Sequence, residues 1–270
     1  MMTDTPTYPG LQVALDGAVL TITLDKPGSF NAFDIELIDA LTACFEHLHD
    51  NTAVRVVLLK ANGKHFCAGV NLKGWNAEIA EPSVQASLRM QTRIGRIVRL
   101  MRSCPQPIIA LGHGAACGGG FSLLLASDVR YGTPDLRMNA AYIKTGLSGC
   151  DIGCSYFLPR LAGASLAAEL LLTGRFLHAD RALQLGLLSD VVPPERLLET
   201  GMALAQEMLA TAPMALRLTK QALGINIDAP GIESAMAIED RQQVMLTMTA
   251  DHVEAVGSFL EKRPPLFRDC

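Results

Sequence analysis

The stretch CGGGFSLLLASD, residues 117–128, places three consecutive glycines directly before an apolar segment that ends in an acid. Glycine weakens a helix, so three of them at a helix start indicate a place where the backbone bends or approaches another group closely. The first N–H groups of a helix have no partner within it, and the helix dipole adds to their positive potential. Such groups stabilise a negative oxygen, so the stretch predicts an oxyanion-binding turn.

A second glycine turn supports this interpretation. HFCAGVNL, residues 65–72, follows the apolar run VRVVLLK at 54–60, just as the triplet follows PIIAL at 107–111. Both runs are typical of buried strands. Two strand-then-glycine units about fifty residues apart can bring two backbone N–H groups side by side, and an oxyanion hole needs two converging donors. The pair predicts a site that polarises a carbonyl.

A dinucleotide site and a nucleophile elbow are both disfavoured at these glycines. Gly112 and Gly114 could begin a G-x-G-x-x-G dinucleotide fingerprint, but Cys117 stands where the third glycine is needed for close helix–strand packing. A nucleophile elbow needs G-x-S-x-G, which does not occur; Ser148 lies in G-L-S-G-C instead.

The composition sets wider limits. The chain has 270 residues, of which 49% are hydrophobic, and a formal net charge of -4, which argues against nucleic-acid binding. Charged or polar residues interrupt every apolar run before it reaches the length of a membrane span. MMTDTPTYPG at the start lacks the basic and apolar regions of a signal peptide. Seven irregularly spaced cysteines then indicate reduced thiols in the cytoplasm, and nothing near Cys150 and Cys154 completes a zinc site.

Working outward, the pattern predicts alternating strands and helices followed by a helical tail. Two alternating apolar runs around Asp16-Gly17 predict a hairpin over 11–24. Asp34 can cap the helix that follows, and the pattern over 83–103 predicts a second long helix. A further strand is expected at 128–131, and almost the whole chain from about 164 onward has a helical pattern. The order is one of repeated β-β-α units, an α/β fold.

The helix predicted at 83–103 carries an arginine about once per turn. Such a stripe can bind phosphates, but spaced charges on a helix usually mark a solvated or subunit-facing side, which is the interpretation favoured here. The arginines are Arg89, Arg93, Arg96, Arg99 and Arg102.

FCAGVNL together with GxxxGGGFxLxxASD resembles the crotonase superfamily, also known as the enoyl-CoA hydratase/isomerase family. The resemblance extends to KPxxxNA at 26–32, LLTGR at 171–175 and FLEKRPPLF at 259–267. It implies a crotonase-like spiral of β-β-α units over 1–195. It also implies a C-terminal helical region over 196–270 that closes the acyl-CoA pocket and builds a homotrimer or a dimer of trimers.

The resemblance also implies the substrate and several of the residues that bind it. The substrate is an acyl-CoA thioester whose carbonyl oxygen lies between the N–H groups of Val70 and Gly119, and coenzyme A enters with it, so no separate cofactor is expected. The 262–267 segment resembles the family's C-terminal CoA contacts, often made to a neighbouring subunit, although a solvated basic turn explains it equally well. The implied substrate-binding residues are Lys26, Ala68, Asn71, Leu72, Lys262 and Phe267.

The sequence departs from the hydratase pattern at both catalytic glutamates. Ser122 occupies the first position, and the second falls near Tyr142. Neither a hydroxyl nor a phenol does a glutamate's acid–base work unaided at neutral pH. The active site is therefore atypical, and ordinary hydration is disfavoured. His113 stands where the family often has asparagine and is interpreted as a hydrogen-bonded structural residue.

One carboxylate remains near these positions. Asp151 begins a D-x-G segment similar to that of dienoyl-CoA isomerases, which place a catalytic aspartate there. The D-x-x-x-S-Y-x-L-x-R pattern also resembles chlorobenzoyl-CoA dehalogenases, whose aspartate is a nucleophile. Asp151 can also cap a helix beginning at Ile152, and the two roles are compatible. Three functions follow: double-bond isomerisation with Asp151 as the base, hydrolysis of a thioester or C–C bond using Asp151, and non-catalytic acyl-CoA binding.

Overall fold

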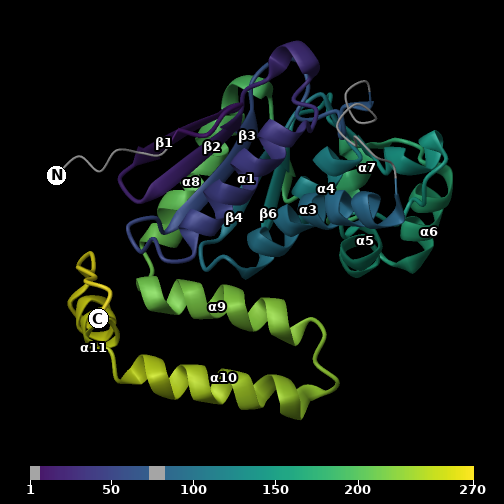
Figure 1. Ribbon diagram of the computed structural model, residues 1–270. Helices are drawn as coiled ribbons and strands as arrows, with labels where there is room; N and C mark the ends of the chain where they lie inside the picture. The colour runs from purple at the N-terminus through teal and green to yellow at the C-terminus, as the bar shows by residue number, and fades with distance from the viewer. Residues whose placement is uncertain (1–6, 73–82) are drawn as a thin grey trace.

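The computed structural model describes residues 7–72 and 83–270, and its main element is a six-stranded sheet in the order β1-β2-β3-β4-β6-β9 (Figure 1). The predicted hairpin pairs antiparallel around Gly17, and every later neighbour in this sheet runs parallel. Residues 1–6, part of the segment expected to carry no export signal, lie outside the description. The strands are β1 (Leu11–Asp16), β2 (Val19–Leu24), β3 (Val56–Ala61), β4 (Ile108–Gly112), β6 (Val129–Gly132) and β9 (Asp190–Val191).

Strand β3 shows how the sheet divides the core. Its side chains alternate between the two faces, as the pleat requires. Val57 and Leu59 join the larger apolar cluster on the face that carries the first helices. Val56 and Leu58 join a smaller cluster on the other face, which α8 (Leu197–Leu209) covers (Figure 1). Both faces are buried, which explains the unbroken apolar run that predicted this strand.

The two predicted long helices form on the larger cluster. Helix α1 (Ile35–Leu48) begins as expected at Asp34, whose carboxylate accepts a hydrogen bond from the Leu37 N–H at 2.9 Å. Helix α3 (Val84–Ser103) lies beside it. The arginine stripe of α3 pairs with acids of neighbouring elements, including Arg93 with Asp39. Part of the arginine stripe is thus used in ion pairs within the chain, which is in keeping with a solvated or subunit-facing side and not with a phosphate site.

A second, three-stranded sheet in the order β5-β7-β8 was not expected. Its strands are too short to show a period, so tertiary pairing rather than local pattern creates them. Strand β5 runs into α4 (Gly119–Ala126), the short helix that the glycine triplet predicted. The strands are β5 (Ala115–Cys117), β7 (Arg137–Asn139) and β8 (Leu177–His178).

The chain beyond β7 is largely helical, and the last three helices reach away from the body (Figure 1). We call α9, α10 and α11 the arm. Large apolar side chains stand exposed on it, including Met248 at 84% and Phe259 at 83%. Over the described residues, no helix is long and apolar enough to cross a membrane. The helices are α5 (Cys154–Ala162), α6 (Ala164–Thr173), α7 (Ala179–Gln184), α9 (Pro213–Asn226), α10 (Ile232–Thr247) and α11 (Ala250–Glu261).

A buried ion pair ties the arm to the body. Lys220 of α9 is 6% exposed, and its ammonium lies 2.9 Å from a carboxylate oxygen of Asp128, in the short link between α4 and β6. Asp128 also accepts hydrogen bonds from Arg102 at 2.7 Å and from the Ile108 N–H at 2.8 Å. Lys220 donates in addition to the carbonyl oxygen of Gln106 at 2.7 Å. The Lys220 ammonium and the Asp128 carboxylate thus each have an oppositely charged partner, which matters because burying an unpaired charge is costly.

Candidate functional site

The two glycine loops meet, as their parallel placement after β3 and β4 predicted. Cys67 and Ala116 form a parallel bridge, in which the Cys67 N–H donates to the Ala115 carbonyl at 3.1 Å. The Cys117 N–H in turn donates to the Cys67 carbonyl at 2.9 Å. The segment before Val70 and the segment before Gly119 therefore lie side by side.

Two N–H groups remain available where these segments end. The neighbours of Val70 are engaged, because the Gly69 carbonyl accepts from Phe33 at 2.7 Å and the Asn71 N–H donates to Phe33 at 2.9 Å. No hydrogen bond from the N–H of Val70 or Gly119 is found to any part of the chain that the structure describes. Gly119 is the first residue of α4, so its N–H is one of those that a helix cannot satisfy itself.

Glycine is required at these positions because there is no room for a side chain. A Cβ on Gly69, whose φ is +87°, would lie 2.8 Å from the Cys117 carbonyl oxygen and 3.5 Å from the Gly119 nitrogen. A Cβ on Gly119 would lie 2.5 Å from the ring of Phe33. The loops approach backbone to backbone, which places the Gly119 N–H close to the start of Val70.

Ser122 and Tyr142, at the two positions where a hydratase has glutamates, contact each other. The Ser122 hydroxyl oxygen lies 3.0 Å from the Tyr142 phenol oxygen and 3.2 Å from the Cys154 sulfur. All three side chains are buried. Burial raises the pKa of Tyr142 well above its usual value and that of Cys154 to about 12. The cluster is therefore neutral over the physiological range.

Asp151 lies beside this cluster with one carboxylate oxygen engaged. Its Oδ1 accepts from the Ile152 N–H at 2.7 Å and from the side-chain amide of Gln91 on α3. Within the described residues no hydrogen bond to Oδ2 is found. Burial raises the pKa of Asp151, and these two donors offset part of the rise. The result is a half-buried carboxylate with a raised pKa, and its Oδ2 accepts no hydrogen bond from the described part of the chain.

The expected cap by Asp151 of a helix starting at Ile152 is wrong. Helix α5 starts at Cys154, and its N-cap is Gly153, whose φ is +84°. Ile152 itself has a φ of +41°, outside the helical region. The side chain of Asp151 therefore bonds the next N–H in a turn and not the first turn of a helix.

The segments implied to bind the substrate differ in their surroundings. Lys26 is already paired: burial opposes its charge, but Asp34 and Glu36 outweigh that effect and raise its pKa. Ala68 and Leu72 are exposed on the glycine loop, Leu72 at 60%. These two residues, with Asn71 between Val70 and Leu72, flank the available N–H of Val70.

Lys262 and Phe267 lie apart from the glycine loops of the same chain. Lys262 ends α11 with a φ of +54°, and Phe267 follows in the last segment, at the far end of the arm from α4 (Figure 1). Arg263, between them, is paired with Glu254 at 2.6 Å. Within this chain, these residues do not meet the glycine loops.

His113 is hydrogen-bonded as expected. Its Nε2 donates to the Gly63 carbonyl at 2.9 Å, linking the end of β4 to the glycine loop. This bond gives the residue a structural role. Among the residues that the structure covers, no group of three potential metal ligands is found.

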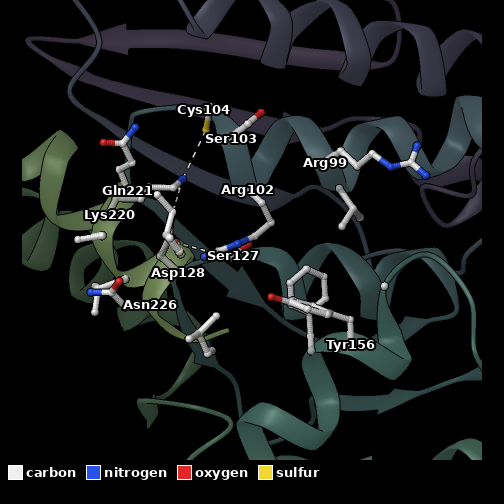
Figure 2. A pocket seen from close by; sticks show the side chains of 18 of the residues that line it. Arg99, Arg102, Ser103, Cys104, Ser127, Asp128, Tyr156, Lys220, Gln221 and Asn226 are labelled. Atoms are coloured by element: carbon white, nitrogen blue, oxygen red, sulfur yellow. Dashed lines mark hydrogen bonds and ion pairs between the residues drawn. The ribbon is translucent and has the colours of Figure 1, made fainter. Parts of the chain in front are cut away.

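A cavity of about 1730 Å³ lies between α3, α5 and the arm (Figure 2). Its lining includes Gln91 and Ile152, the two residues that donate to Asp151. Figure 2 shows Lys220, Asp128 and Arg102 converging in this cavity, whereas Arg99 points away from them. The cavity therefore reaches the hydrogen-bond partners of Asp151.

Sequence reasoning missed Gln91 and Cys154. Gln91 is an ordinary polar residue on a helix, and nothing in its neighbours distinguishes it. Cys154 suggests only a metal ligand when the sequence is taken alone. Its spacing from Asp151 placed it in the first turn of a helix expected to begin at Ile152, a position that could have suggested a side chain facing the site.

The chain is similar to known proteins over nearly its whole length. The sequence profile described as enoyl-CoA hydratase/isomerase matches residues 15–270. A Mycobacterium leprae protein named probable enoyl-CoA hydratase is 35% identical over 270 residues, covering 97% of this chain and 89% of its own. The 1,2-epoxyphenylacetyl-CoA isomerase of Escherichia coli is 30% identical over 253 residues, covering 94% and 96%. The crystal structure of an enoyl-CoA hydratase from Mycobacterium smegmatis superposes with a TM-score of 0.88 at 34% identity, covering 96% and 98%.

Proposed function

The chain belongs to the enoyl-CoA hydratase/isomerase family, and we propose that it moves a double bond within an acyl-CoA thioester through an enolate-like oxyanion. The observation that supports this proposal is the meeting of the two glycine loops, together with the finding that neither the Val70 N–H nor the Gly119 N–H has a hydrogen-bond acceptor among the described residues. Two such donors suit the thioester oxygen as it gains negative charge. Coenzyme A enters as part of the substrate, and no other cofactor is proposed.

Asp151 is proposed as the base. Its free Oδ2 takes a proton from the carbon next to the double bond, and the electrons move onto the thioester oxygen between the two donors. The same carboxyl group then returns the proton to another carbon, so the double bond shifts and no atom is gained or lost. The raised pKa of Asp151 supports this role because a base works best when its pKa approaches the working pH.

The neutral cluster supports isomerisation over hydration. Hydration needs a pair of acid–base groups that hold a water molecule, and the glutamate positions carry Ser122 and Tyr142, joined to each other at 3.0 Å. Isomerisation needs only one base that moves a proton. The naming of one relative as an acyl-CoA isomerase is in keeping with this choice.

The arm is proposed to complete the site between protomers. Its exposed apolar side chains, such as Phe259 and Leu260 at 83% and 74%, suit burial against another copy in a trimer or a dimer of trimers. Lys262 and Phe267 would then contact coenzyme A bound to a neighbouring protomer. We accordingly assign 1–195 to the catalytic core and 196–270 to assembly and pocket closure, although α8 of the second region lies on the sheet.

Asp151→Asn tests the proposal. Asparagine keeps an oxygen at Oδ1 for both donors, Gln91 and Ile152, but removes the base. We expect deuterium exchange at the α and γ carbons of enoyl-CoA thioesters to collapse while acyl-CoA affinity stays within about tenfold. Asp180→Asn, on the exposed first turn of α7, is the matched control.

Two results would contradict the proposal in different ways. Exchange that survives in the Asp151→Asn protein removes Asp151 from the mechanism. Tight acyl-CoA binding with no exchange in either protein favours the non-catalytic binder, and release of free coenzyme A by the unaltered protein favours hydrolysis of the thioester bond.

A further inference from the structure

The carboxylate of Asp151 is held by donors from two different parts of the chain. Its Oδ1 accepts from the Ile152 N–H at 2.7 Å and from the side-chain amide of Gln91, sixty positions earlier on α3. The Asp151 carbonyl oxygen also accepts from the Cys154 N–H at 2.9 Å, which fixes the main chain of the turn. Because both donors to the carboxylate use the same oxygen, they fix its rotation and leave Oδ2 for another partner.

The turn that carries Asp151 is strained. Ile152 is β-branched and has a φ of +41°, a conformation that such residues rarely adopt. Gly153 follows with a φ of +84°, and a Cβ there would lie 2.6 Å from the ring of Phe157. Strained backbone persists only where the surroundings determine it, and it concentrates at functional sites. Here the strained turn directs the Ile152 N–H at the carboxylate, so it serves the orientation of Asp151.

Helix α3 presents Gln91 to this turn, and a second residue of the helix contacts the same turn. A Cβ on Gly153 would lie 3.4 Å from Cγ1 of Val98, which is seven positions and nearly two full turns beyond Gln91. Ion pairs from the arginine stripe join α3 to α1. The face of α3 that carries Gln91 is therefore fixed against the turn, and the amide contact does not depend on one long side chain alone.

No charged side chain offsets the charge of Asp151 within the part of the chain that the structure describes. No ion pair with its carboxylate is found there, and the cavity arginines Arg99 and Arg102 lie more than two turns of α3 beyond the donating amide. Its titratable neighbours are Tyr142 and Cys154, and burial keeps both neutral. Two hydrogen-bond donors thus favour the ionised carboxylate, and one of them is a side chain that can be replaced.

We infer that Gln91 is a positioning residue for the proposed reaction: its amide holds Oδ1 of Asp151, which keeps the carboxylate ionised and leaves Oδ2 to take the substrate proton. The inference rests on the proposed function, because it takes Asp151 as the base. A neutral amide suits this task. Its hydrogen bond favours the ionised form without the full positive charge of a lysine or arginine, which would lower the basicity of the carboxylate much further.

Gln91→Met tests the inference, because methionine keeps the length of the side chain and has no N–H to donate. The pKa of Asp151 is measured directly, from the carboxyl carbon resonance that disappears in Asp151→Asn. We expect this pKa to rise by about 0.5–1 pH unit, and the acid limb of kcat/KM for deuterium exchange to rise with it. Above that limb, kcat should fall about tenfold because the carboxylate has lost its fixed orientation, while KM stays within about twofold.

Two further variants make the comparison specific. Gln91→Glu places a second carboxyl group beside Asp151, so the two should titrate as a pair whose higher pKa exceeds that of Asp151 in Gln91→Met. Gln184→Met, at an exposed position on α7, is the matched control and should change neither the pKa of Asp151 nor the rate of exchange.

The outcomes separate the inference from the proposed function. An unchanged pKa of Asp151 in both Gln91 variants overturns the inference, whether or not the protein catalyses exchange. An unchanged exchange profile in Gln91→Met, with exchange still lost in Asp151→Asn, also overturns it and leaves the proposed function intact. If the pKa rises but exchange persists in Asp151→Asn, the proposed function fails, and the inference fails with it.

Discussion

A Cβ on Gly120 would lie 2.4 Å from the carbonyl oxygen of Cys67, and this approach joins the helix that follows one glycine loop to the backbone of the other. The obstructing atom belongs to the main chain, which cannot rotate away as a side chain does. The third glycine of the triplet is therefore needed for assembly of the site, in addition to the donor role proposed for the second.

We expect Gly120→Ala to destabilise the protein by about 1–3 kcal/mol, because the added methyl group must push two backbone segments apart. Urea unfolding measures this loss. Gly257→Ala is the control: Gly257 lies inside α11 with nothing within 4 Å of its Cβ position, so alanine should be neutral or stabilise by about 0.5–1 kcal/mol. An unchanged midpoint for Gly120→Ala would show that the loops do not meet as described.

The rate of the proposed isomerisation should rise with pH through a pKa above that of an ordinary aspartate. Burial raises the pKa of Asp151, and only the deprotonated carboxylate can act as the base. The pH profile of kcat/KM with an enoyl-CoA measures this limb. A profile that is flat from about pH 4 to pH 7 would be incompatible with Asp151 as the base.

Asp151→Asn should stabilise the protein at neutral pH. A carboxyl group whose pKa is raised on folding contributes its full stability below the unfolded pKa, and that contribution is lost as the pH rises through the folded pKa. The amide carries no such penalty. Because the side chain is only half-buried, we expect a gain of less than about 1 kcal/mol at pH 7. Thermal unfolding of both proteins at several pH values checks this, and the gain should shrink as the pH falls toward the usual aspartate pKa.

Lys220→Met should loosen the arm. The change leaves the buried carbonyl oxygen of Gln106 without this donor and removes one of the two cations at Asp128, so we expect a loss of about 1–3 kcal/mol. Lys144→Met, at an exposed position, should change stability by less than about 0.5 kcal/mol. Limited proteolysis should show earlier cleavage between α8 and α9 in the Lys220 variant. Equal stability of the two variants would argue that the pair does not hold the arm.

Two of the seven thiols should react quickly with a thiol reagent in the folded protein. Cys150 and Cys270 are exposed, whereas burial raises the pKa of the other five, to about 12 for Cys44, Cys67 and Cys154. Thiolate is the reactive form, so the shifted groups are slow. Spectroscopic titration with a thiol reagent before and after unfolding counts the thiols that react quickly in the folded protein and the thiols of the whole chain. Rapid reaction of Cys154 in the native protein would mean that the cluster around Ser122 opens to solvent.

The sequence predicted the parts of the fold that carry a long or repeated pattern. The buried run at 54–60 and the helix beginning after Asp34 formed where expected, because burial on both faces and a capping carboxylate each leave a clear local signal. Strands β5, β7 and β8 were not predicted. Each has only two or three residues, and each exists because the glycine loops and their neighbours bring it to a partner.

The same limit applies to the site: features marked within one segment were predictable, and contacts between distant segments were not. Glycines mark backbone approach, so the meeting of the two loops could be anticipated from their spacing. The contact of Ser122 with Cys154, thirty-two positions apart, and that of Asp151 with Gln91, sixty apart, depend on how helices pack. The prediction of a helix cap at Asp151 was wrong for a local reason. An aspartate before an apolar segment suggests a cap, but Ile152 and Gly153 have left-handed conformations, so the helix starts two residues later than expected.

The ion pair between Lys220 and Asp128 has a consequence for the order in which the chain acquires its structure. Asp128, Arg102 and the strand at Ile108 are all synthesised well before α9, and they already form hydrogen bonds with one another. The ammonium of Lys220 gains a buried partner only after that framework exists, since burying it alone would be costly. We therefore expect a chain that ends before α9 still to form the hydrogen bonds of Asp128 with Arg102 and Ile108.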